Sequence, residues 1–156
     1  MVMCNPHNPT GRVFTKKELQ RIADAVNNIP GKTVYFSDEI FADLAFEDFH
    51  SALSLGLSCE KVVVASSISK AFNVESIQGG FSIVPGAILL KEYKKWQQAL
   101  RVSHTETAML MLEVCYSPSL GPEWLGQVKH QIQHNLRIAS EIISKDLPQL
   151  IFSKPE

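Results

Sequence analysis

The lysine at position 70 has the residue type and the setting of a reactive amine. It follows the serine-rich run Ser66–Ser69, which itself follows an apolar stretch, Val62–Ala65. If that stretch is a strand of an α/β sheet, Lys70 lies at the carboxyl edge of the sheet, where such folds bind their ligands. An amine in that position suits Schiff-base formation with a carbonyl compound. The alternative is an ordinary surface lysine, because lysines are almost never fully buried.

Two other polar residues follow runs that read as strands, and each is a candidate for the same crevice. Asn8 lies between Pro6 and Pro9, which would hold its amide rigidly as a hydrogen-bond donor; the alternative is a plain strand-to-helix loop. Asp38 follows the apolar run Thr33–Ser37. At about 4 Å and an effective dielectric near 20, its carboxylate would stabilise a protonated ring nitrogen by roughly 4 kcal/mol. The alternative for Asp38 is a helix N-cap.

The serines before the lysine form a third group of candidates. The hydroxyls of Ser67 and Ser69, with nearby backbone amides, are suitable donors to a phosphate group. The alternative is that they cap the end of the strand. Because all three segments follow strand-like runs, the sequence predicts one site at the carboxyl edge of a sheet.

The strands themselves are predicted from apolar runs at residues 2–4, 33–37 and 61–65. Continuous apolar runs of this kind are typical of parallel strands that are covered on both faces. A fourth run, at residues 79–85, follows too soon for the crossover that a parallel neighbour needs, so an antiparallel strand is predicted. The expected fold is therefore α/β, with a mostly parallel sheet and helices on both faces.

Helices are predicted between and after these strands. Thr15–Glu18 has the pattern of a capping box, and the helix that it starts should end at Pro30. Residues 87–117 have a helical pattern, and residues 124–145 read as a long helix with apolar residues for a buried face. The last apolar run, Leu150–Phe152, is typical of another strand.

Composition narrows the class of protein. Hydrophobic residues make up 45% of the 156 residues, which indicates a globular core. The net charge of −1 gives no basic surface for nucleic acid or an anionic membrane, and no run is long enough to span a membrane. Three widely spaced cysteines form no disulfide framework and no metal pair, so we expect a cytoplasmic protein.

Three motifs together resemble a known family. Asn5–Gly11, Ser37–Ile40 and Ser67–Lys70, in this order and at these spacings, resemble the large domain of the class I/II aminotransferases, which are pyridoxal phosphate enzymes of fold type I. Cys4–Thr15 and Ser69–Asn73 look more specifically like the cystathionine β-lyase, or cysteine-S-conjugate β-lyase, branch. The resemblance covers nearly the whole chain.

The resemblance implies a role for each candidate residue. Lys70 would form the Schiff base with pyridoxal 5′-phosphate and later move the Cα proton of the substrate. Asp38 would pair with the protonated ring nitrogen, and Asn8 would donate to the ring oxygen O3′. Ser67 and Ser69 would contact the phosphate. The Asn8-Pro9 bond is expected to be cis, as it is in some relatives.

Three positions depart from the pattern of the aminotransferases. Phe41 stands where they commonly have a tyrosine that donates to O3′. Gln78 stands where they commonly have a phosphate-binding arginine; glutamine is also common in the lyase branch, and as a cofactor contact it brings no charge. Glu75 lies where relatives have small residues, and it adds negative charge near the phosphate position.

The resemblance implies a pyridoxal phosphate-dependent carbon–sulfur β-lyase. Such an enzyme acts on a small amino-acid substrate, cystathionine or a cysteine S-conjugate, and yields a thiol, pyruvate and ammonia. An aminotransferase on the same fold is the alternative. Residues 1–117 would belong to the cofactor-binding large domain and residues 118–156 to a long helix leading to a small domain. A homodimer is expected by analogy.

A different hypothesis is that the chain is a truncated, non-catalytic piece or an assembly module. The resemblance places a ring-stacking aromatic residue before residue 1 and a substrate-binding arginine after residue 156. On this basis, we expect residues 1–156 alone to be inactive and to bind no cofactor.

Overall fold

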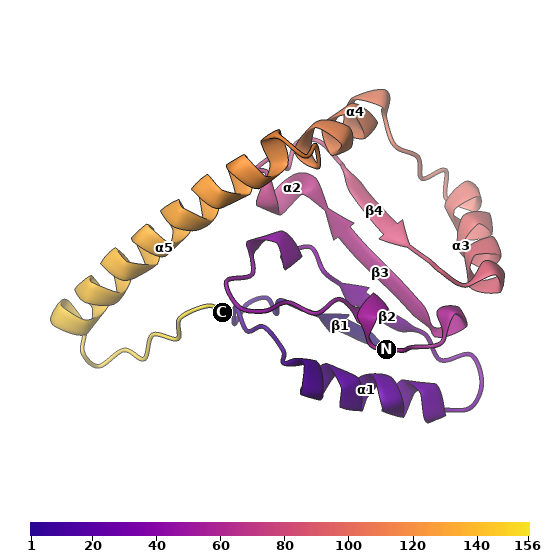
Figure 1. Ribbon diagram of the computed structural model, residues 1–156, viewed down its shortest axis with the longest axis horizontal. Helices are drawn as coiled ribbons and strands as arrows, with labels where there is room; N and C mark the ends of the chain where they lie inside the picture. The colour runs from indigo at the N-terminus through magenta and orange to yellow at the C-terminus, as the bar shows by residue number, and fades with distance from the viewer.

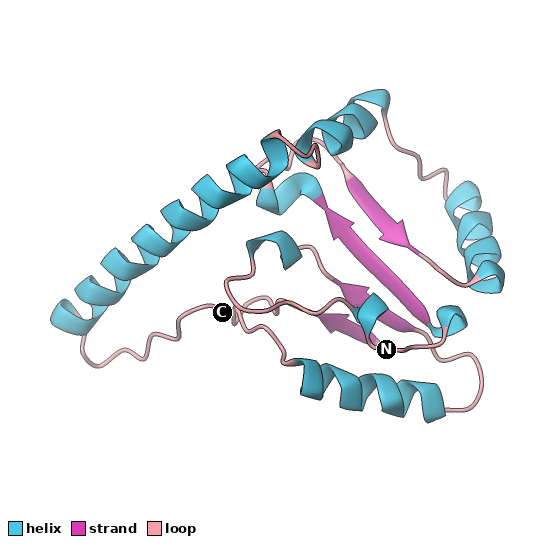
Figure 2. Ribbon diagram, in the orientation of Figure 1, coloured by secondary structure: helices cyan, strands magenta, loops and turns pink.

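Four strands form one sheet in the spatial order β1-β2-β3-β4 in the computed structural model, which describes all residues from 1 to 156 (Figure 1). The strands are β1 (Val2–Cys4), β2 (Tyr35–Asp38), β3 (Val62–Ser67) and β4 (Gly80–Ile83). Five helices accompany them: α1 (Lys16–Asn28), α2 (Ile68–Ala71), α3 (Ala87–Ala99), α4 (Glu106–Cys115) and α5 (Leu120–Asp146) (Figure 2). Short 3-10 helices cover Ala42–Leu44, Ala52–Ser54 and Cys59–Lys61.

The strand directions match those predicted. Strands β1, β2 and β3 are parallel, and β4 pairs antiparallel with β3. The register aligns Cys4 with Asp38 and Asp38 with Ala65. The segments that follow the first three strands therefore leave the sheet at one edge. The α/β class with a mostly parallel sheet is confirmed.

Helix α1 begins with the predicted capping box. The hydroxyl of Thr15 accepts from the amide of Glu18, and the carboxylate of Glu18 accepts from the amide of Thr15 over 3.0 Å. The hydroxyl of Thr15 also donates to the Glu18 carboxylate over 2.8 Å. This bond, together with the one from the Thr15 amide, lowers the pKa of Glu18 below its usual value. The helix ends at Asn28, two residues before Pro30, because proline supplies no amide to continue it.

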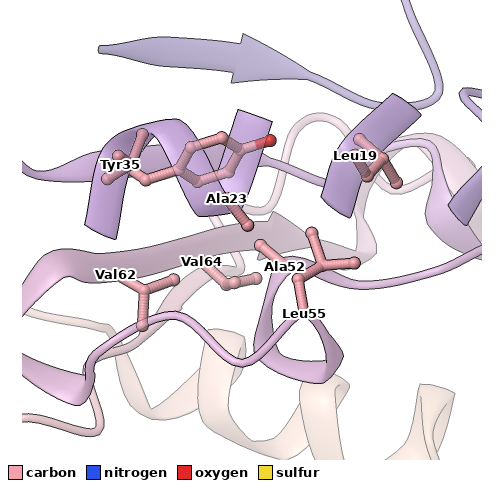
Figure 3. Close-up of a cluster of buried hydrophobic side chains, with 8 residues drawn as sticks. Leu19, Ala23, Tyr35, Ala52, Leu55, Val62 and Val64 are labelled. Atoms are coloured by element: carbon pink, nitrogen blue, oxygen red, sulfur yellow. The ribbon is translucent and has the colours of Figure 1, made fainter. Parts of the chain in front are cut away.

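The main core lies between α1 and one face of the sheet. Leu19, Ala23 and Val26 form the buried stripe of α1. Figure 3 shows this helix packing against side chains from β2, β3 and the segment between those strands. The remaining members of the cluster are Tyr35, Ala52, Leu55, Val62 and Val64. On the opposite face of the sheet, Val2 is 74% exposed.

A second, smaller core joins α2 to α4. Its buried members are Ile68, Ala71, Phe72 and Cys115. Burial raises the pKa of the Cys115 thiol. Helix α5 is attached here as well, because the indole Nε1 of Trp124 donates to the carbonyl of Ala71 over 3.0 Å. The short helix that carries Lys70 is thus held from both sides.

The helical region at 87–117 is two helices instead of one. Helix α3 ends at Ala99, and Arg101 has a left-handed φ of 52°, which no residue within a right-handed helix adopts. Helix α5 begins at Leu120, earlier than expected, with Pro122 in its first turn, where its missing amide costs no hydrogen bond. No helix combines the length and apolar character that crossing a membrane requires.

Two expectations for the C-terminal part are wrong. Helix α5 has no continuous buried face, since Ile138 and Ile142 are 42% and 51% exposed where the helix extends beyond the sheet (Figure 1). Residues 150–152 form no strand. A strand needs a neighbour to pair with, and the tail instead crosses to the loop after β1. There the amide of Glu156 donates to the carbonyl of Gly11 over 2.8 Å.

Candidate active site

The sequence-predicted site residues lie at or just beyond the carboxyl edge of the parallel strands. Beyond the strands, the amide of Asn5 donates to the carbonyl of Asp38 over 3.0 Å, and the amide of Glu39 donates to the carbonyl of Ala65 over 2.8 Å. These bonds continue the ladder past the strand ends. The loop after β1, the end of β2 and the turn after β3 are thereby held at one edge of the sheet.

The loop after β1 is anchored at its base. Asn5 is 2% exposed, and its side-chain oxygen accepts from the amide of Phe14 over 2.9 Å. The peptide bond before Pro9 is cis, as expected, and so is the bond before Pro6. Asn8 itself is exposed, and its side chain makes no hydrogen bond within the chain. Its amide is therefore free to bind a ligand.

Asp38 ends β2 and is half-buried. Its Oδ1 accepts from the amide of Ile40 over 3.2 Å, and its Oδ2 has no partner in the chain. The alternative of a helix N-cap is wrong, since the next helical turn begins at Ala42, with Phe41 at the cap. One carboxylate oxygen thus remains for an external donor.

Glu39, next to Asp38, has a different environment. It is 5% exposed, and its Oε1 accepts from Ala52 N at 2.8 Å, Ser37 Oγ at 3.0 Å and Ser51 Oγ at 3.1 Å. Burial raises the pKa of Glu39, and the charge of Asp38 adds to this, while the three hydrogen bonds oppose it. Glu39 fixes the loop after β2 to the sheet, a role that the sequence did not indicate.

The turn after β3 carries the serines and the lysine. The hydroxyl of Ser67 accepts from the amide of Ser69 over 3.1 Å and donates to its hydroxyl over 3.0 Å. Ser67 thus caps the helix α2, which was the alternative to phosphate binding, although the hydroxyl of Ser69 can still donate. Lys70 has a side chain that is 39% exposed, and its amine forms an ion pair with Glu75.

The remaining predicted positions are more open. Gln78 is exposed, and its side chain has no hydrogen-bond partner in the chain. Phe41 is half-buried and lines a hollow of about 260 Å³ together with Asn8 and Pro9. Asp38 and Lys70 do not line this hollow. The structure thus brings the predicted residues to one edge without enclosing them in one cavity.

The C-terminal tail covers part of this hollow. Pro155 and Glu156 are among its lining residues, and Glu156 Oε2 accepts from the amide of Val13 over 3.0 Å. A side chain at Gly11 would collide with Pro155, because a Cβ there would overlap the Cβ of Pro155. No local pattern in the sequence indicates this contact, which joins the two ends of the chain.

Comparison with known sequences identifies a family. The family described as aminotransferase class I and II matches residues 1–152. Cystathionine beta-lyase PatB of Bacillus subtilis is 28% identical over 159 residues, a match that covers 99% of this chain and 40% of PatB. The chain thus spans about 40% of the length of this relative.

Comparison with solved structures gives the same result. A pyridoxal phosphate-bound C-S lyase from Staphylococcus hominis, complexed with L-cycloserine, has a TM-score of 0.86 and 25% identity, with 99% of this chain and 39% of the lyase covered. A pyridoxal phosphate-bound putative aminotransferase from Clostridium difficile has a TM-score of 0.86 and 25% identity, with 99% and 40% covered. The fold is shared with both kinds of enzyme.

Proposed function

Because this chain belongs to the aminotransferase class I and II family, we propose that it carries the lysine-bearing part of a carbon–sulfur β-lyase site. The cofactor would be pyridoxal 5′-phosphate. The substrate would be cystathionine or a cysteine S-conjugate, and the products a thiol, pyruvate and ammonia.

The chemistry of the residues at the sheet edge fits this cofactor. When bound, pyridoxal phosphate supplies an aldehyde that condenses with amines and a ring that accepts the electrons of a breaking Cα–H bond. The chain offers an amine, a carboxylate, an amide and a hydroxyl for the aldehyde, ring nitrogen, ring oxygen and phosphate. These groups belong to Lys70, Asp38, Asn8 and Ser69, since the Ser67 hydroxyl donates to Ser69.

One observation carries the proposal: the register that aligns Cys4, Asp38 and Ala65. It brings the segments containing Asn8 and Lys70 to the same edge as Asp38, although they lie far apart in the sequence. The unpartnered Oδ2 of Asp38 is available to a protonated ring nitrogen.

The proposed steps use these side chains in order. The Lys70 amine would hold the cofactor through its aldehyde and, once free, would take the Cα proton of the substrate. The Asp38 carboxylate would keep the ring nitrogen protonated, which would stabilise negative charge at Cα. Asn8 would orient the ring through its amide, and Ser69 and Gln78 would hold the phosphate.

Two residues favour the lyase over the aminotransferase. Phe41 has no hydroxyl to donate to the ring oxygen as an aminotransferase tyrosine does. Gln78 brings no charge to the phosphate, and glutamine is common at this position in the lyase branch. The similarity to PatB and to the Staphylococcus hominis C-S lyase supports this choice. We further propose a cytoplasmic homodimer in which residues 118–156, with the long helix α5, lead to a second domain.

Borohydride trapping tests the cofactor assignment. A protein that contains this chain in a complete site is incubated with pyridoxal phosphate, reduced, digested and analysed by mass spectrometry. We expect the phosphopyridoxyl group on Lys70 and none at this position in Lys70→Ala. Labelling spread equally over the exposed lysines, with none concentrated at Lys70, would contradict the proposal and favour a non-catalytic chain.

A turnover assay separates the two activities. A protein that contains this chain in a complete site should release pyruvate from cystathionine without an added 2-oxo acid. Amino transfer that depends on a 2-oxo acid, with no pyruvate from cystathionine, would instead identify the aminotransferase.

A further inference from the structure

The loop between α2 and β4 returns over α2 and holds Glu75 beside Lys70. Asn73 has a left-handed φ of 55°, a conformation that asparagine tolerates better than most residues. The chain therefore reverses directly after α2. The amide of Val74 then donates to the carbonyl of Ser69 over 3.1 Å, and the Val74 side chain packs on the smaller core. These contacts hold the backbone just before Glu75 in place.

The carboxylate of Glu75 is the hydrogen-bond partner of the Lys70 amine, and the chain offers that amine no other. The two side chains are 39% and 60% exposed, so either group can be reached by a small reagent. The sequence indicated Glu75 as a charge near the phosphate position. In the structure, the Glu75 carboxylate lies beside the Lys70 amine instead.

We propose that Glu75 is a positioning residue that holds the Lys70 amine and competes with carbonyl compounds for it. This inference rests on the proposed role of Lys70. An amine attacks a carbonyl carbon through its nitrogen lone pair. While the ion pair is intact, the nitrogen is held against the carboxylate, and the contact must break before the attack. Loss of the Glu75 charge therefore makes Lys70 more reactive.

Residue-resolved acetylation tests this without any cofactor. With N-acetoxysuccinimide, the amine attacks the ester carbonyl, N-hydroxysuccinimide leaves, and the nitrogen loses a proton to water. Mass spectrometry gives a rate for each lysine, and the rate at Lys70 is divided by the rate at Lys32, an exposed lysine, in the same sample. We expect Glu75→Gln to raise this ratio about two- to fivefold at low salt, the range that an exposed ion pair supports.

A matched control and a salt series complete the experiment. Glu92→Gln removes a carboxylate that lies 4.0 Å from the amine of Lys95, and it should leave the Lys70 ratio unchanged. Raising the salt to about 1 M, where the screening length is about 3 Å, should narrow the difference between wild type and Glu75→Gln.

Equal Lys70 ratios in wild type and Glu75→Gln at low salt, or a difference that salt does not narrow, would overturn the inference. Because acetylation needs no pyridoxal phosphate, this result is separate from the trapping experiment. Faster acetylation of Lys70 in Glu75→Gln supports the inference even if trapping refutes the cofactor.

Discussion

The side chains of Ser37 and Glu39 are joined by a buried hydrogen bond of 3.0 Å. Alternate residues of a strand point to the same face of a sheet, so this bond places both side chains on one face and turns Asp38, between them, to the other. One oxygen of Glu39 accepts from Ser51 and Ala52 in the loop after β2, whereas Asp38 accepts only from the amide of Ile40, two residues along the chain. Although they are adjacent, Glu39 thus anchors the loop after β2, and Asp38 keeps an oxygen for a ligand.

The first prediction concerns the pH dependence of stability. Burial raises the pKa of Glu39 from its usual value of 4.5, so the folded chain binds this proton more tightly than the unfolded chain does. The stabilisation is therefore fully present below about pH 4.5 and is lost as the pH rises through the raised pKa. Glu39→Gln keeps an acceptor oxygen without the charge. The unfolding free energy of Glu39→Gln, relative to that of wild type, should therefore increase as the pH rises through this range.

Urea unfolding at several pH values measures this difference. Glu47→Gln is the matched control, because Glu47 is exposed, and its stability should follow wild type throughout. Glu39→Ala should lose about 1–3 kcal/mol, since buried donors lose their acceptor. If the stability of Glu39→Gln ran parallel to wild type at all pH values, Glu39 would not titrate as the structure indicates.

The second prediction concerns Tyr35. Its side chain is fully buried and its hydroxyl has no hydrogen-bond partner in the chain. Removing an unsatisfied polar group relieves its desolvation cost, so Tyr35→Phe should be neutral or up to about 1 kcal/mol more stable. Tyr93→Phe is the control, because the Tyr93 hydroxyl donates to Ser82 over 2.9 Å. That variant should lose about 1 kcal/mol in chemical denaturation. Equal losses in both variants would show that the Tyr35 hydroxyl has a partner.

The third prediction concerns the tail. Gly11 has a φ of 68°, and a Cβ there would clash with Pro155. Gly11→Ala should release the C-terminal residues, which limited proteolysis of the tail detects as faster cleavage. Gly31→Ala is the control. It loses roughly 1–2 kcal/mol of stability through a similar left-handed backbone conformation, but a Cβ there meets nothing within 4 Å. Cleavage of the tail at the same rate in both variants would rule out the contact with Pro155.

The fourth prediction concerns the link between α5 and α2. Trp124→Phe keeps an aromatic ring but removes the donor to the carbonyl of Ala71. Its unfolding free energy should fall by about 0.5–1.5 kcal/mol. Trp96→Phe is the control, since Trp96 is 64% exposed and makes no such bond, and its stability should change little. A loss in Trp96→Phe as large as that in Trp124→Phe would contradict the structural role of the indole bond.

Local patterns in the sequence determined much of the fold. The Thr15 capping box and the apolar stripe that follows it specify α1, because both act within a few turns of one helix. The short connection before β4 specified its antiparallel direction, because a parallel crossover does not fit. The three motifs also indicated the family and named the side chains at the sheet edge.

The tertiary structure decided what depends on residues far apart in the chain. Leu150–Phe152 reads as a strand by composition, but no strand edge receives it, and the tail binds near Gly11 instead. Glu39 is buried because the loop after β2 brings Ser51 and Ala52 to it. Glu75 reaches Lys70 because the turn at Asn73 reverses the chain. Side-chain type sets the chemistry that is available, and the path of the backbone decides which groups meet.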